Sequence, residues 1–336
     1  MRIETETRPA LVGFVLVAFC LGVVQLSIAY AQSAFALAAI VWLIVVWRER
    51  RLPQVPPFFV PLLVYAALTL VSAAMSSDPR ASFWDSRQLF LLLLVPVVAR
   101  FARGDRAAMV INVVIALGAA GAVVGIVQFA MFGFDDLSKR PVGTLSHYMT
   151  YSGVLMLVTG AAISRLLFHR GEWIWPAIAV PALVVALGAT YARNAWVGVF
   201  VAVVCLLALK NWRLIIIAPV AAVVLLALAP AGIRQRAFSM FDLNDPTNRD
   251  RRAMLKVGAG MVQDHPFFGV GPEMIQREYP QYRPPDAVNP TNPHLHNVPV
   301  QIAAERGLPA LAAWIWFVVV ALRDLLKQVR HGPARS

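Results

Sequence analysis

Residues 214–230 read LIIIAPVAAVVLLALAP, and residues 231–252 that follow read AGIRQRAFSMFDLNDPTNRDRR. An apolar run of this kind, without one charged side chain, is typical of a helix that crosses a lipid bilayer. The polar sequence continues to about residue 297 and separates the earlier apolar runs from a last one. Because ionisable groups inside a bilayer are costly, we expect the chemistry of this chain in the long polar segment.

The composition is that of an integral membrane protein. Of the 336 residues, 59% are hydrophobic and 14% are charged, whereas a soluble domain carries about 25% charged residues. The formal net charge of +12 does not indicate a nucleic-acid partner. Much of the Lys and Arg lies in short loops between apolar runs, where membrane topology accounts for it. We therefore predict an all-α protein surrounded by membrane lipids.

Ten apolar runs are long enough, or nearly long enough, to cross about 30 Å of hydrocarbon. They lie at residues 11–30, 33–47, 57–75, 88–102, 107–131, 147–168, 173–191, 195–210, 213–230 and 307–325. No small-residue cleavage site follows the first run, so we interpret it as a span and not as a signal peptide. The prediction is a polytopic protein of about 10 transmembrane helices. Residues 1–230 carry nine of them, residues 231–306 form a polar region with short helices, and residues 307–336 hold the last span and a tail.

The charges in the loops predict the orientation. With ten spans, the loops on the side of the N-terminus carry 16 Lys and Arg residues. The short loops on the other side carry five, namely Arg80, Arg87, Lys139, Arg140 and Arg193. Positive charge in short loops marks the cytoplasmic side, and long loops do not count. Both termini are therefore predicted in the cytoplasm, and residues 231–297 on the outer face.

Several other features are assigned structural roles. Cys20 and Cys205 both lie in apolar runs, so we expect buried free thiols and not a disulfide or a metal site. Residues 265–272, HPFFGVGP, are expected to form a turn. Tyr279 and Tyr282 suit the membrane headgroup belt, with stacking on a sugar as the alternative.

Arginines near the predicted outer face are candidate anion ligands. Arg193 lies at the junction of two spans, where it either reaches lipid phosphates or binds a phosphate ligand. Arginine suits a diphosphate because its planar fork donates two hydrogen bonds and stays charged. Arg249, Arg251 and Arg252 open an amphipathic stretch for which Asp245 and Thr247 are capping candidates. This run is either a solvated helix start or a phosphate site.

The sequence HLHN at residues 294–297 precedes a helix predicted to start near Val298. His294 and His296 lack an evident third ligand, so we expect no metal. An imidazole in polar surroundings beside an anion site is suited to act as a general base or proton shuttle. Glu305 and Arg306 then interrupt the apolar pattern. We interpret residues 298–306 as an outer-face helix and place the start of the last span at Gly307.

These motifs together resemble the O-antigen ligase family. The similar stretches are HLHNVPVQIAAERGLP (294–309), NRDR (248–251), DHPFFGVG (264–271), TYARNAWVG (190–198) and PVGTLSHYMT (141–150). Each motif is weak alone, but their order and spacing are fairly specific. One departure is Leu255, which stands where the family usually has Trp.

The resemblance implies a GT-C-like membrane glycosyltransferase in the bacterial inner membrane, with its active site facing the periplasm. Such a ligase moves a glycan from undecaprenyl diphosphate to the lipid A-core oligosaccharide, without a metal, a nucleotide sugar or another cofactor. By this resemblance His296 is the catalytic residue and Arg193 and Arg251 bind the diphosphate. The residues that would support them are Arg249, Arg252, His294 and Asn297.

The acceptor stays open at this stage. O-antigen polymerases and protein O-oligosaccharyltransferases share the same signature, so the resemblance specifies the donor better than the acceptor. A single displacement of the diphosphate would invert the anomeric centre. A lipid or polysaccharide transporter is the alternative from another class, and it would carry ionisable residues within its spans. The predicted spans 11–30 and 107–131 hold no charged residue, and the span 213–230 holds only Arg213 at its first position, which favours an enzyme.

Overall fold

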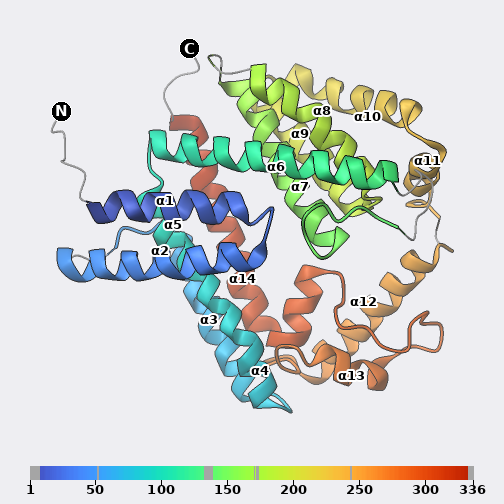
Figure 1. Ribbon diagram of the computed structural model, residues 1–336. Coiled ribbons are helices and arrows are strands. Elements are labelled where there is room, and N and C mark those ends of the chain that lie inside the picture. The colour runs from blue at the N-terminus through green and yellow to red at the C-terminus, as the bar shows by residue number, and fades with distance from the viewer. Residues whose placement is uncertain are drawn as a thin grey trace. The chain divides into compact units, whose positions relative to one another are not determined.

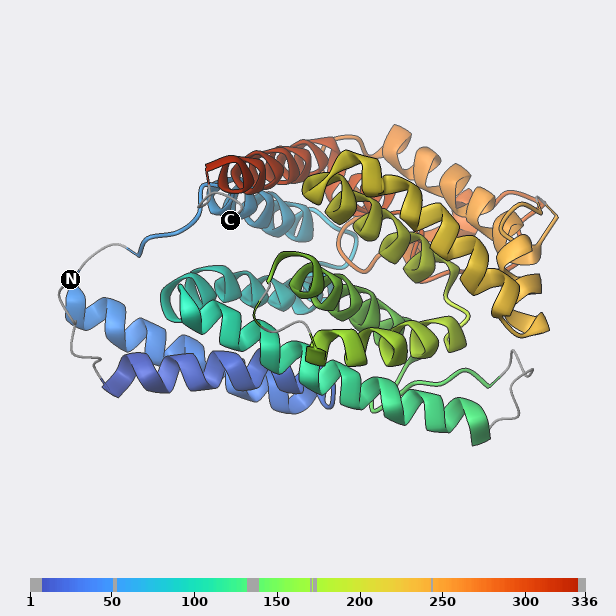
Figure 2. The same ribbon diagram turned by 90° about the horizontal axis from the view of Figure 1, so that it is seen from above.

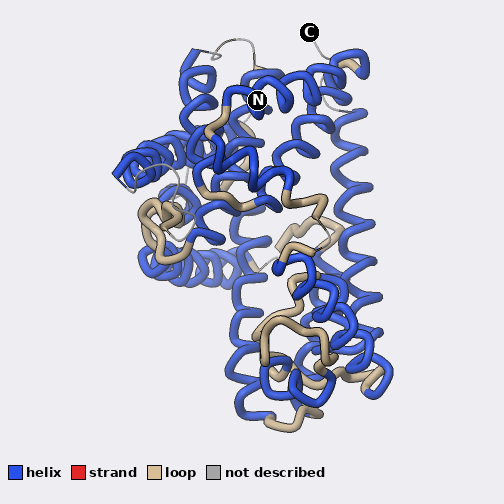
Figure 3. Tube along the Cα trace, turned by 90° about the vertical axis from the view of Figure 1, so that its right-hand side faces the viewer, coloured by secondary structure: helices blue, strands red, loops and turns tan. Residues whose placement is uncertain are grey.

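The computed structural model of the protein describes residues 8–50, 53–131, 139–169, 171, 174–242 and 244–331. Within these ranges the chain forms helices, turns and loops and no strand (Figure 3). This confirms the prediction of an all-α protein. The chain divides into two compact units, residues 1–52 with 100–241 and residues 53–99 with 242–336.

The first unit is a helical bundle built around α6, α7 and α8. The antiparallel helices α1 and α2 lie side by side (Figures 1 and 2) and pack on α6 through α1. Ile115, Leu155 and Leu183 form the centre of its core. The helices of this unit are α1 (Arg8–Val23), α2 (Ile28–Glu49), α6 (Asp105–Met131), α7 (Tyr148–Phe168), α8 (Ile174–Ala189), α9 (Arg193–Lys210), α10 (Ile217–Leu228) and α11 (Ala231–Phe238).

The second unit combines two stretches that are far apart in the sequence. In it α3 (Phe59–Ala74) packs along α14 (Val298–His331), which also contacts α12 (Pro246–Asp264) (Figure 1). α4 (Pro79–Ser86) follows α3, and α13 (Ile275–Tyr282) follows α12. The core between α12, α13 and the start of α14 contains Met254, Val257, Tyr279 and Leu295. After α4, a 3-10 helix (Arg87–Leu93) and α5 (Leu94–Phe101) lead the chain back to the first unit.

The protein is an α-helical membrane protein. Six helical stretches in the described residues are long and apolar enough to cross a bilayer: Ile28–Glu49, Pro79–Phe101, Asp105–Met131, Tyr148–Phe168, Arg193–Lys210 and Val298–Val329. Four shorter apolar helices are Arg8–Val23, Phe59–Ala74, Ile174–Ala189 and Trp212–Leu228. Each of the ten predicted runs overlaps one of these helices.

The first predicted span, residues 11–30, is wrong at its end. α1 ends at Val23, and α2 begins at Ile28 after a turn. The turn is held by Gln25, whose side-chain amide donates to the carbonyl oxygen of Val114 at 2.7 Å. Gln25 is buried, so a polar side chain inside an apolar run marks a packed turn and not the continuation of a helix.

Two further expectations need correction. Cys20 is buried as predicted, but Cys205 is exposed because it lies on an outward face of α9. Tyr279 belongs neither to a headgroup belt nor to a sugar platform, because its side chain is fully buried in the core of the second unit.

The helical path of α14 breaks at Gly307, the residue at which the sequence predicts the last span to begin. Gly307 has φ 82° and ψ 169°, a conformation that favours glycine. A Cβ atom at this position would also lie 2.1 Å from the carbonyl oxygen of Phe267. The break therefore separates residues 298–306 from the apolar remainder of α14.

Candidate active site

The N-terminus of α12 presents the arginine cluster. Asp245 caps this helix, since its carboxylate accepts from the backbone N–H groups of Thr247 at 3.0 Å and Asn248 at 3.3 Å. This confirms Asp245 as the cap. The positive dipole end of a helix favours anions, and the Asp245 carboxylate already occupies the first N–H groups here.

The arginines of this cluster differ in exposure. Arg249 and Arg252 are exposed, whereas Arg251 is half-buried. Asp250 between them is buried. A long flexible side chain that is already partly enclosed loses less entropy when it binds a ligand. Arg251 is therefore the best placed of the three to hold an anion in one geometry.

Asp250 ties the loop after α13 to α12. Its carboxylate accepts from the side-chain amides of Asn289 at 2.8 Å and Asn292 at 3.4 Å. Asn292 is buried and also donates to the hydroxyl oxygen of Tyr279 at 3.1 Å. This anchor is not evident from the sequence. The only local signal is an acidic residue within an arginine run, and nothing in the sequence identifies its partners about 40 positions later.

The same loop ends at the two histidines. Leu295 is 1% exposed and packs into the core of the second unit, while His294 and His296 on either side are exposed. Gly258 of α12 allows this approach, because a Cβ atom there would lie 2.9 Å from Leu295 Cδ1. Among the described residues, no three His, Cys, Asp or Glu side chains are grouped to hold a metal ion.

The backbone conformation at His296 and at the residue after it is well defined. His296 itself has φ 50°, in the left-handed region that residues other than glycine rarely adopt. The side-chain oxygen of Asn297 accepts from the backbone N–H of Val300 at 3.1 Å and so caps α14, which begins at Val298 as predicted. Asn297 thus has a local structural role next to the candidate base.

His296 and Arg251 share one electrostatic environment. The surrounding protein lowers the pKa of His296 below its ordinary value, first by limiting its hydration and then through the positive charge of Arg251, with a smaller contribution from His294. Asp250 acts in the opposite direction. A lowered pKa keeps the imidazole neutral near pH 7, which is the form that can accept a proton. The fold therefore brings together the predicted base and one predicted phosphate ligand.

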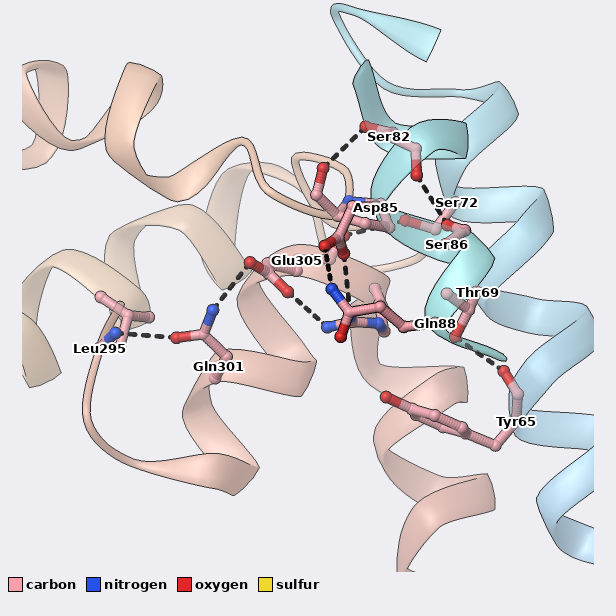
Figure 4. A network of polar contacts seen from close by, with 12 residues as sticks. Tyr65, Thr69, Ser72, Ser82, Asp85, Ser86, Gln88, Leu295, Gln301 and Glu305 are labelled. Atoms are coloured by element: carbon pink, nitrogen blue, oxygen red, sulfur yellow. Dashed lines mark hydrogen bonds and ion pairs between the residues drawn. The ribbon is translucent and has the colours of Figure 1, made fainter. Parts of the chain in front are cut away.

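A polar network leads from the histidine loop into the unit (Figure 4). The backbone N–H of Leu295 donates to Gln301 Oε1 at 2.8 Å, and Gln301 Nε2 donates to Glu305 Oε1 at 2.7 Å. Glu305 forms an ion pair with Arg306, and Arg306 Nη2 lies 3.9 Å from Asp85 Oδ2. Glu305 and Arg306 were identified in the sequence only as a helix interruption. In the structure they connect the first part of α14 to α4.

The turn after α12 holds the break in α14. The backbone N–H groups of Val270 and Gly271 donate to the carbonyl oxygens of Ala304 at 2.8 Å and Glu305 at 2.9 Å. The hydroxyl of Ser72 on α3 also donates to the Glu305 carbonyl at 2.9 Å. These bonds satisfy backbone groups that the break would otherwise leave unpaired. The turn predicted at residues 265–272 is confirmed.

Arg193 belongs to the first unit. It is the first residue of α9, is 5% exposed, and donates from Nη1 to the hydroxyl oxygen of Ser239 at 2.9 Å. Tyr191, two residues before Arg193, is buried and has φ 53°. An arginine that reaches lipid headgroups keeps its guanidinium exposed, so this burial argues against that alternative. Its role as a ligand stays a prediction.

Comparison with known proteins supports the motif assignment. A model of the O-antigen ligase family matches residues 177–315, a range that contains Arg193, Arg251 and His296. The resemblance inferred from the motifs is thereby confirmed. A search of curated proteins and a search of solved structures each found no match.

Proposed function

We propose that this protein, whose residues 177–315 match a model of the O-antigen ligase family, transfers a glycan from undecaprenyl diphosphate to the lipid A-core oligosaccharide. The family indicates a glycosyltransferase of the O-antigen ligase or polymerase type. The observation that carries the proposal is that Asp250, the neighbour of Arg251, ties the loop that ends at His296 to α12, where the positive charge of Arg251 also acts on the histidine. A neutral base beside a fixed cation suits an acceptor hydroxyl that attacks a sugar diphosphate.

The chemistry is a single displacement. A hydroxyl oxygen of the acceptor forms a bond to the anomeric carbon while the bond from that carbon to the diphosphate oxygen breaks, which inverts the anomeric centre. His296 takes the hydroxyl proton, and the bond electrons leave with the diphosphate. A fixed guanidinium binds the diphosphate more strongly as its negative charge develops, so it lowers the barrier. Arg251 and Arg193 are the residues proposed for this task.

In the proposed topology all ten apolar helices cross the inner membrane and both termini lie in the cytoplasm. The positive charges of the loops support this orientation. Residues 231–297 would then face the periplasm, where the lipid-linked donor and the lipid A-core acceptor meet. A GT-C-like enzyme of this kind works at the membrane surface.

The test is transfer by purified protein in proteoliposomes. Lipid-linked glycan is supplied with lipid A-core, with a second lipid-linked unit, or with an acceptor protein. We expect product with lipid A-core. Product with only the second donor unit would make the protein a polymerase, and product with only the acceptor protein would make it a protein O-oligosaccharyltransferase.

The matched variants are His296→Ala and His294→Ala. Both residues are exposed histidines of the same loop, so the pair controls for general effects of removing an imidazole. We expect His296→Ala to abolish transfer without loss of membrane insertion, and His294→Ala to have a milder effect. Full activity of His296→Ala would refute the assignment of the base.

A further inference from the structure

The loop that carries His296 is held by one side chain of α14. Gln301 accepts the backbone N–H of Leu295 at 2.8 Å and donates to Glu305 at 2.7 Å (Figure 4). Leu295 is the residue directly before His296, and its side chain is buried. With Asn297 capping α14 on the other side, the backbone of His296 is fixed from both neighbours. Its left-handed φ needs such support, because this conformation is intrinsically unfavourable.

Glu305 determines which way the Gln301 amide points. A carboxylate only accepts hydrogen bonds, so the amide nitrogen of Gln301 must face Glu305 and the amide oxygen must face the N–H of Leu295. Glu305 is 4% exposed, and a buried carboxylate needs a partner of opposite charge. Arg306 supplies that charge, and Asp85 lies on the other side of the guanidinium. The order of donors and acceptors is thus specified from α4 to the histidine loop.

We infer that Gln301 is a positioning residue for the proposed transfer, and that Glu305 is the group that sets its orientation. Neither side chain touches the reacting atoms; both act through the backbone at Leu295, which holds His296 beside Arg251. This inference rests on the proposed function for its effect on catalysis, but the hydrogen-bonded chain itself is observable without catalysis. The ordinary alternative is that Gln301 only contributes to helix stability.

Exchange of the two side chains separates these possibilities. Gln301→Glu alone places a second carboxylate against Glu305, and the repulsion breaks the contact. The double variant Gln301→Glu/Glu305→Gln restores every bond in reversed order. The carboxylate introduced at position 301 accepts from Leu295 and from the amide introduced at position 305, and the oxygen of that amide accepts from Arg306. Gln276→Glu on α13 is the control, because it makes the same change at an exposed position of the same unit.

The first readout is transfer kinetics. For Gln301→Glu we expect kcat to fall by about a hundredfold, the typical result of displacing a catalytic group by about 1 Å, with little change in KM. The double variant should recover most of this loss, and Gln276→Glu should behave like the wild type. Wild-type kcat for Gln301→Glu, or a double variant no better than that single one, would overturn the inference. Because the second substitution can also restore stability, kcat is calculated per folded protein, so that a folding defect of the single variant does not count as a loss of kcat.

The second readout is hydrogen exchange at the backbone amide of Leu295, measured in detergent without substrate. We expect protection in the wild type, its loss in Gln301→Glu and its return in the double variant. If the wild type shows no transfer but the exchange pattern follows this order, the proposed function fails and the positioning chain stands. If transfer occurs and the exchange pattern is the same in all variants, the positioning chain fails and the proposed function stands.

Discussion

Removal of the Asp250 carboxylate is expected to release the loop that ends at His296. In Asp250→Ala, the buried amide of Asn292 loses its charged acceptor and water cannot replace it, because this residue is only 7% exposed. A hydrogen bond to a charged group contributes about 1.5–3 kcal/mol. The second donor, Asn289, is exposed and is rehydrated, so its bond adds little. The expected loss of local stability is therefore about 2–3 kcal/mol.

The assay is hydrogen exchange in peptides that cover residues 283–297. A loss of 2–3 kcal/mol raises the population of the opened loop, and thus its exchange rate, by about thirty- to a hundred-and-fifty-fold, because about 1.4 kcal/mol corresponds to a factor of ten. The free energy of global unfolding should fall less than the free energy of opening the loop. The reason is that the packing of α3 and the apolar part of α14 does not depend on Asp250.

The matched control is Asp286→Ala. Asp286 lies in the same loop, but its ion pair with Lys256 at 3.4 Å is exposed on both sides, and such pairs contribute about 0–1 kcal/mol. We expect at most about fivefold faster exchange for this variant. Equal exchange in the two variants, or no change in Asp250→Ala, would refute the role of Asp250 as the anchor of the loop.

Three further predictions concern topology and charge. In a cysteine-free background, Asn289→Cys should react with an impermeant thiol reagent in intact spheroplasts; labelling only after lysis would reverse the proposed orientation. Arg193→Lys and Arg251→Lys should each lose transfer almost as fully as the alanine variants, by about a hundred- to a thousandfold, because an ammonium lacks the bidentate fork. Turnover close to wild type for Arg193→Lys, at matched membrane expression, would return this residue to a structural role such as its bond to Ser239. Arg251→Gln removes a positive charge that lowers the pKa of His296, so this pKa should rise. The neutral imidazole then appears at higher pH, and the midpoint of its modification by diethyl pyrocarbonate should move upward; an unchanged midpoint would contradict the proximity of the two residues.

The membrane helices could be predicted because their signal is local. Apolar runs of sufficient length specify helices wherever the backbone must satisfy its own hydrogen bonds. The exception is the turn between α1 and α2, which depends on a contact with a distant part of the chain. A single Gln25 inside an apolar run is compatible with a continuous helix. Its side chain, however, donates a hydrogen bond to the carbonyl oxygen of Val114, 89 residues away. A polar residue whose partner lies on another helix carries no sign of that partner in the sequence around it.

The candidate site was predictable only in part for the same reason. Arg251 and His296 were found because their motifs are recognisable in order and spacing, and the structure places them in one environment. The groups that hold them there were missed. Asp250 acts on a residue 42 positions later, and Arg306 faces a carboxylate from α4. Such pairings depend on how helices pack, and packing follows from the whole fold rather than from a single stretch.

The discontinuous second unit has a consequence for the synthesis of the protein. Residues 53–99 leave the ribosome before residues 100–241, and residues 242–336 leave it only after the whole of 100–241 has been made. During that interval α3 and α4 exist without α14, and Asp85 lacks the guanidinium of Arg306 that faces it in the finished fold. The face of α3 that packs along α14 also stays uncovered until α14 has been made. The loop that carries His296 and the partner of Asp85 are synthesised close together, so the candidate site and the packing that supports it are completed in the same step.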